Sequence, residues 1–227
     1  ESTGVFNLDS GIINIGTAGQ SSWFEVGNGV NCTGTLNMSG GTVTKIGNDH
    51  FSLGTNQGNG TAKITGGTMT INNEIWVGQR PNSVGLLEIS PGATITNNSW
   101  VAIGREGGKG TVNMTGGTWN KNGTSNFIVG ASGADGIAGE GIMNLSGGAV
   151  TVAPSGEPNR GITWIGEQNL STGTLNMSGA ANATTFTTAR MTLGEVAGAT
   201  GNLNLNGGTL RVGQLTGGGG TRNGQFH

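Results

Sequence analysis

The chain has 227 residues with a formal net charge of −2, and 48 of the residues are glycine. Collagen is excluded because Gly does not recur at every third position, and disorder is excluded because 33% of the residues are apolar and the net charge is low. Only 10% of the residues are charged, which excludes the basic surface that binds nucleic acid, and no apolar run approaches the length of a membrane span.

A short repeat begins near the N-terminus and continues through the chain. A divergent copy, VFNLDSGIIN, stands at 5–14, and a clear copy, TLNMSGGTVT, follows at 35–44. Later copies stand at 61–70, 86–96, 111–120, 142–151, 174–183 and 202–211. Between copies lies an apolar-x-apolar-Gly run, which ends at Gly27, Gly54, Gly78, Gly104, Gly130, Gly166 and Gly194. A unit that recurs at this length indicates a solenoid.

Apolar and polar residues alternate with a period of two residues in each unit, which indicates three short strands whose apolar positions point inward. The first strand contributes two inward columns, which hold Leu36 and Met38 in the clear copy. The third strand also contributes two, which hold Phe51 and Leu53 in the next unit. The second strand contributes one inward column, made of Val43, Met69, Ile95, Trp119, Val150, Phe186 and Leu210. Helical repeats are excluded because no window shows the 3.6-residue period.

This pattern predicts an all-β protein, a right-handed single-stranded parallel β-helix with three sheets and about seven coils. The right hand follows from the handedness rule for parallel crossovers. Residues 1–216 are expected to form the β-helix. Residues 217–227, GGGGTRNGQFH, lack the pattern and are expected to be a Gly-rich linker or tail.

The alternate positions of the third strand are expected to point outward, and four of the five tryptophans fall there. They are Trp23, Trp76, Trp100 and Trp164. An exposed row of large aromatic side chains marks an interaction site. Two insertions, 131–141 and 153–161, are expected to border the same face. Trp119 falls in an inward column and is expected in the core.

This face suits the binding of sugar rings, whose apolar faces stack on aromatic side chains. We expect Trp76 and Trp100 to be stacking platforms and Trp23 and Trp164 to extend the site. Neighbouring polar side chains are expected to bind sugar hydroxyl groups. These are Glu25, His50, Glu74, Gln79, Arg80 and Arg105.

Three other interpretations of the outward positions stay open. The tryptophans would also fit lateral packing against one another or a protein interface. Outward threonines at 42, 44, 68, 70, 94, 96 and 118 are typical of ice-binding β-helices, although Thr also favours strands in general. An outward asparagine column is expected to form a structural amide ladder. Its members are Asn7, Asn37, Asn113, Asn144, Asn176 and Asn204.

The sequence predicts no enzyme, metal site or cofactor. Calcium-dependent lyases need clustered carboxylates, and glycoside hydrolysis needs two opposed carboxylates. The best acid–base group in the chain is Glu25, His50 and Glu74, which we interpret as the polar rim of a binding face.

Segments such as TLNMSGGTVT and NLNLNGGTLR resemble the autotransporter-associated strand repeats of bacterial surface and secreted proteins. The coils, the Gly-rich exit and the tryptophan sheet together resemble the β-helical modules of bacterial xylanases, carbohydrate-binding module family 89. That resemblance implies a secreted, non-catalytic module that binds xylan and is tethered to a glycoside hydrolase domain. The alternative is a structural or adhesive segment of a bacterial surface protein.

Overall fold

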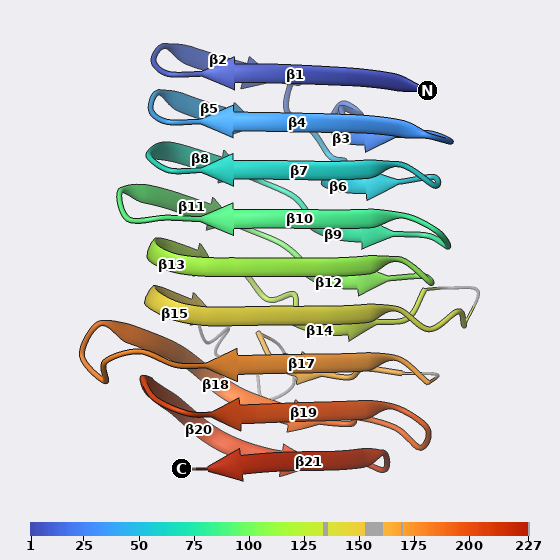
Figure 1. The fold of residues 1–227 in the computed structure, drawn as a ribbon, viewed down its shortest axis with the longest axis vertical. Helices are drawn as coiled ribbons and strands as arrows, with labels where there is room; N and C mark the ends of the chain where they lie inside the picture. Colours follow the sequence, from blue (N-terminus) through green and yellow to red (C-terminus); the bar gives the residue numbers. More distant parts are fainter. Residues whose placement is uncertain (134–135, 153–160, 169, 227) are drawn as a thin grey trace.

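A computed structural model describes residues 1–133, 136–152, 161–168 and 170–226, and within these residues every regular element is a β-strand. Parallel strands stack along one axis into a β-solenoid of about eight turns (Figure 1). The predicted all-β parallel β-helix is confirmed, with one turn more than expected.

The strands form three parallel ladders, one for each predicted sheet. The first ladder contains β1 (Ser2–Leu8), β4 (Cys32–Met38), β7 (Asn59–Ile64), β10 (Val84–Ile89), β13 (Lys109–Lys121), β15 (Glu140–Val152), β17 (Thr172–Met177), β19 (Thr200–Leu205) and β21 (Thr221–Phe226). The second contains β2 (Ile12–Ile15), β5 (Thr42–Lys45), β8 (Gly67–Ile71), β11 (Ala93–Asn97), the ends of β13 and β15, and the starts of β18 (Thr184–Leu193) and β20 (Thr209–Gly217). The third contains β3 (Phe24–Asn28), β6 (Phe51–Thr55), β9 (Ile75–Gln79), β12 (Val101–Arg105), β14 (Phe127–Ala131), β16 (Thr163–Ile165) and the ends of β18 and β20.

The coil is right-handed. In Figure 1 the first-ladder strands run from right to left across the near side of the stack, and the chain returns behind them as it descends from the N-terminus. Glycine recurs near the end of the third-ladder strands, and Gly78 in β9 shows why. Gly78 has a φ of 71°, and a Cβ at this position would overlap the backbone carbonyl of Lys109. Glycine supplies both the left-handed conformation and the space.

The predicted inward columns form one continuous apolar core. Leu36, Ala62 and Leu87 face one another in register on the first ladder and are fully buried. Trp119 and Phe186 occupy the column of the second ladder, as expected, and both are fully buried. Apolar burial at about 25 cal/mol per Å² is the main force that stabilises such a stack.

A second inward column on the second ladder was not predicted, because it is largely polar. Lys45, Ile71, Asn97 and Lys121 follow one another in register, and all four are buried. The Lys121 ammonium donates to the backbone carbonyls of Asn122 (2.7 Å) and Gly123 (3.3 Å). These long side chains satisfy carbonyl groups at the corner between the second and third ladders, as buried polar groups must. Burial lowers the pKa of Lys121 to about 8.

The outer faces of the first two ladders carry the expected polar columns. Asn144, Asn176 and Asn204 form an amide ladder with bonds of 2.7 Å, and Asn37 bonds Asn7 at 2.8 Å. Lys63 and Glu88 interrupt this ladder and form an ion pair at 3.6 Å. On the second ladder the threonine columns continue further than predicted. They also include Thr151, Thr185, Thr187 and Thr209.

Residues 217–227 do not form the expected tail as far as the structure describes them. Strand β21 pairs in parallel with β19 in unbroken register, so the ladder extends to Phe226 and past the expected boundary at 216.

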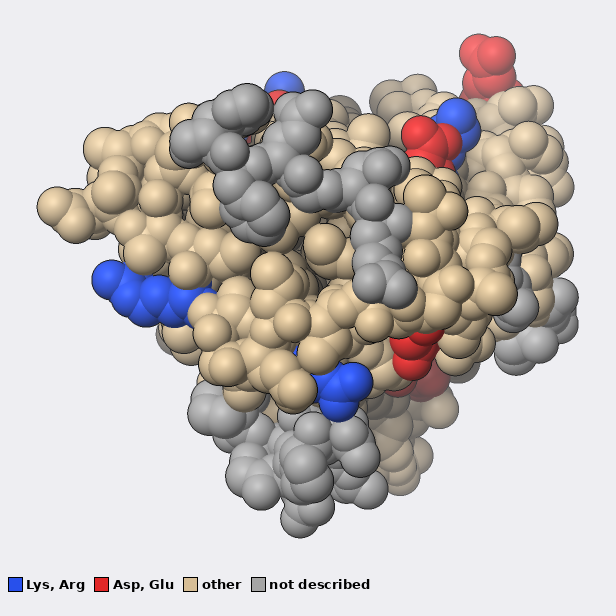
Figure 2. Space-filling view, turned by 90° about the horizontal axis from the view of Figure 1, so that it is seen from below, with Lys and Arg blue, Asp and Glu red and all other residues tan. Residues whose placement is uncertain are grey.

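Seen from below in Figure 2, charged side chains are few and scattered, with no large surface of one sign. At the opposite end, the first coil leaves Val5 and Ile12 exposed.

The core packing predicts a large difference between two tryptophan variants. Trp119 is fully buried, and its ring contacts Phe127 edge-on at 5.2 Å. We expect Trp119→Ala to lower the free energy of unfolding by about 3–5 kcal/mol, because it leaves a cavity. Urea denaturation measures the loss. Trp23→Ala is the matched control, since Trp23 is 57% exposed, and it should change stability by no more than about 0.5 kcal/mol. Equal losses in both variants would contradict this view of the core.

Candidate functional site

The outward column of the third ladder is only partly exposed. Ser52, Trp76, Ala102, Ile128 and Trp164 follow one another in register. Ser52, Ala102 and Ile128 are nevertheless buried. A second, smaller apolar cluster covers the middle of this face. It consists of Ala102, Ile128 and Ala131, with Trp76, Trp100 and Trp164 packed against them. Three of the four outward tryptophans therefore pack against side chains of the sheet. This arrangement agrees with the lateral-packing interpretation.

Two predicted site residues contact the ring of Trp76. The His50 ring stacks on Trp76 with the ring centroids 3.7 Å apart and the planes 21° from parallel. The Arg105 guanidinium lies 4.5 Å from the centre of the Trp76 ring and 4.8 Å from that of Trp100. The two Arg105 contacts are stabilising cation–π interactions. Trp76 and Trp100 are therefore packed by protein side chains and are not the freely exposed platforms that we expected.

Trp23 is the exposed aromatic side chain of this face, and it borders an open cavity of about 480 Å³. The lining consists of Trp23, Glu25, Asn28, His50, Thr55, Asn56, Trp76, Gln79, Arg80, Arg105 and Glu106. Seven of the ten predicted site residues thus come together around one cavity. The other three, Glu74, Trp100 and Trp164, do not line it.

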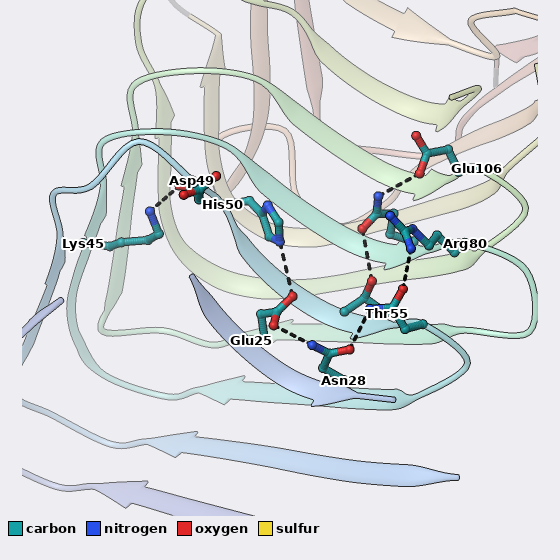
Figure 3. Close-up of polar contacts among 10 residues, drawn as sticks. Glu25, Asn28, Lys45, Asp49, His50, Thr55, Arg80 and Glu106 are labelled. Atoms are coloured by element: carbon teal, nitrogen blue, oxygen red, sulfur yellow. Dashed lines mark hydrogen bonds and ion pairs between the residues drawn. The ribbon is translucent and has the colours of Figure 1, made fainter. Parts of the chain in front are cut away.

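One edge of the cavity is a hydrogen-bonded group that begins at Glu25 (Figure 3). The Glu25 carboxylate accepts hydrogen bonds from Asn28 at 2.5 Å and lies 3.4 Å from His50 Nε2. Asn56 donates to Asn28 at 2.8 Å, and Arg80 donates to Asn56 at 2.7 Å. These side chains come from three successive coils, so each coil orients the polar groups of the next.

The other edge is centred on Glu106, which is labelled opposite Glu25 in Figure 3. Glu106 accepts a hydrogen bond from Gln79 at 2.7 Å and pairs with Arg105 at 2.8 Å. Thr55 donates to the Gln79 side-chain oxygen at 3.1 Å. Both carboxylate oxygens of Glu106 are therefore engaged, and the donors around the cavity are held in fixed positions.

Sequence reasoning missed four lining residues, namely Asn28, Thr55, Asn56 and Glu106. All four lie at or just after the last position of a third-ladder strand, beyond the columns that the period of two defined. The apolar-x-apolar-Gly runs contained the signal for these positions. Residues that follow equivalent glycines on successive coils lie beside one another.

Burial changes the protonation of several groups near the cavity. It lowers the pKa of His50, against the opposing effect of Glu25, and so favours the neutral imidazole. It raises the pKa of Glu74, which Arg105 opposes. It also lowers the pKa of Arg105, where the carboxylates of Glu106, Glu74 and Glu167 oppose the shift.

Glu167 is a buried carboxyl group that the sequence did not single out. It follows β16, and its backbone N–H donates to Gly130. Burial, together with the nearby charge of Glu195, raises the pKa of Glu167 to about 7, although Ser132 and Arg105 act in the opposite direction. Its charge state therefore changes near neutral pH.

No group of three or more His, Cys, Asp or Glu side chains suited to a metal ion occurs in the described part of the chain. The described part also contains no helix long and apolar enough to cross a membrane. Insertion 131–141 begins at the last residue of β14, and its residues 134–135 lie outside the described residues, as do residues 153–160 of the other insertion. Comparisons with protein-family models, curated proteins and solved structures found no match.

The raised pKa of Glu167 predicts a stability change between pH 5 and pH 8. The folded state holds this proton more tightly than the unfolded state, where a Glu has a pKa of about 4.3. The stabilisation is therefore complete below about pH 4 and is lost as the pH rises through about 7. We expect Glu167→Gln, which stays neutral, to raise the melting temperature at pH 8 and to change it little at pH 5.

Glu140→Gln is the control, because Glu140 is exposed and pairs with Lys109 on the surface. Its effect on the melting temperature should differ little between the two pH values. If Glu167→Gln likewise showed the same effect at both, Glu167 would not be the group that titrates near pH 7.

Proposed function

We propose that this protein is a non-catalytic carbohydrate-binding module and that the cavity beside Trp23 holds part of a β-linked glycan chain. The observation that carries the proposal is the position of one exposed tryptophan beside a cavity whose polar groups are fixed by one another. Sugar rings have apolar faces and hydroxyl edges, and binding sites for small ligands combine an aromatic surface with a few oriented polar groups. Trp23 would supply the aromatic surface.

The fixed geometry of the polar side chains around the cavity supports a binding role. Asn28, Gln79 and Arg105 are oriented by carboxylates before any ligand arrives. Because these side chains are already ordered in the free protein, a ligand would not need to immobilise them. The entropy cost of binding is therefore lower, which favours affinity. The cavity is open to solvent, so a sugar unit bound in it can belong to a longer polymer.

The finer parts of the proposal come from resemblance to xylanase modules. They are the choice of xylan, the tether to a glycoside hydrolase domain and secretion. The module would hold an attached enzyme close to insoluble plant cell-wall material. The competing class is a structural or adhesive repeat of a surface protein, for which the cavity would have no ligand.

Affinity electrophoresis through gels that contain soluble xylan, mixed-linkage β-glucan or no sugar tests the proposal. We expect the wild-type chain to be retarded by xylan. Trp23→Ala should weaken binding by about 2 kcal/mol, roughly 30-fold, because the aromatic anchor is lost. Circular dichroism should show the fold of this variant unchanged.

Trp164→Ala is the matched control, since Trp164 lies on the same face but does not line the cavity. It should keep wild-type retardation. Loss of binding in Trp164→Ala but not in Trp23→Ala would move the site away from the cavity. Unchanged mobility of the wild-type chain in every gel would refute the proposal and favour the surface-repeat alternative.

The threonine columns of the second ladder support a second candidate function, ice binding. Thr42, Thr68 and Thr94 face one another in register, as do Thr44, Thr70 and Thr96, at the coil spacing of about 4.8 Å. Ice binding predicts measurable thermal hysteresis that Thr70→Lys abolishes, because the long charged side chain would interrupt the regular array. A hysteresis of zero in the wild-type chain would exclude this function.

A further inference from the structure

Arg80 stands where three depressions of the surface meet. It lines the cavity beside Trp23, a second of about 470 Å³ and a third of about 290 Å³. The second shares Asn28 and Asn56 with the first, and the third shares Glu106 with it. A chain-like ligand that leaves the first cavity over this edge therefore passes the Arg80 side chain.

The charge of Arg80 is not neutralised by the described residues. Lys63, Lys109 and Arg105 each pair with a carboxylate on the same or the neighbouring coil. Arg80 makes no such ion pair with any described residue, and its hydrogen bond goes to the neutral amide oxygen of Asn56. The two carboxylates that line the cavity, Glu25 and Glu106, are already bound by other side chains.

The backbone at Arg80 is held in a conformation that arginine rarely adopts. Its φ is 74°, and the residues next to it on the adjacent coils, Asn56 and Glu106, have φ values of 52° and 51°. Glycine is the usual residue in this left-handed region, and strain of this kind concentrates at functional sites. The strained turn directs the Arg80 side chain to the junction of the three depressions, where Asn56 fixes one of its nitrogens.

We propose that Arg80 binds a carboxylate on the glycan, so that the preferred ligand is a β-glycan that bears uronic acid groups. This inference rests on the proposed carbohydrate-binding function and assigns the class of ligand to the same site. A guanidinium matches a carboxylate with two parallel hydrogen bonds, whereas neutral sugar hydroxyl groups would leave its charge unpaired. The main chain of the polymer would lie beside Trp23, and the acidic group would reach Arg80.

The test uses one glucuronate-substituted xylan in two forms, the native polymer and the same polymer after its carboxyl groups have been reduced to alcohols. Affinity electrophoresis or calorimetry at fixed low salt measures the binding of each form. We expect wild-type protein to bind the native polymer about tenfold more tightly than the reduced one. Arg80→Gln should bind both forms equally, with the affinity that the wild-type chain shows for the reduced polymer.

Arg211→Gln is the matched control, because Arg211 is exposed on the second ladder and its replacement removes the same charge. It should keep the tenfold preference. If the wild-type chain bound both forms equally, or Arg80→Gln kept the preference, the role of Arg80 would be refuted while carbohydrate binding stood. If neither form bound, the proposed function and this inference would both be refuted.

Discussion

Backbone hydrogen bonds between successive coils place each residue about 4.8 Å from its counterpart on the next coil, and the rest of the structure depends on that register. Leu36, Ala62 and Leu87 meet because their strands pair without a shift. A slip of one residue would turn every inward side chain outward. The register also explains why one short repeat is sufficient to specify the fold, since each copy needs only to match its two neighbours.

The same register sorts polar residues into columns whose members must satisfy one another. Asparagines bond along the first ladder, and where the column changes to Lys63 and Glu88 the two opposite charges are adjacent. Inside the solenoid, Lys45 and Lys121 are tolerated because their ammonium groups reach backbone carbonyls at a corner. Burial disfavours their charged form, so the core accepts them at a cost in free energy that the carbonyl contacts offset.

Around the cavity, packing and exposure compete for the same aromatic side chains. Trp76 and Trp100 lie against the sheet and under Arg105, where they help to fix that guanidinium. Trp23 lies on the coil where this packing ends, and it stays exposed. The result is a rigid polar edge beside one free aromatic surface, a combination that suits an extended ligand with apolar faces and hydroxyl edges.

The sequence by itself determined the parallel β-helix, its inward apolar columns and the face that carries the tryptophans, because those features follow from the spacing of apolar residues and glycines. It did not reveal the inward position of Lys121, since residue type alone predicts exposure for lysine. Nor did it reveal Glu106 or Asn56, which lie beyond the last strand position, or the stacking of His50 on Trp76. Side chains that the sequence pattern predicts to point outward are buried or exposed according to the volume of their neighbours on adjacent coils. Only the tertiary structure decides that packing.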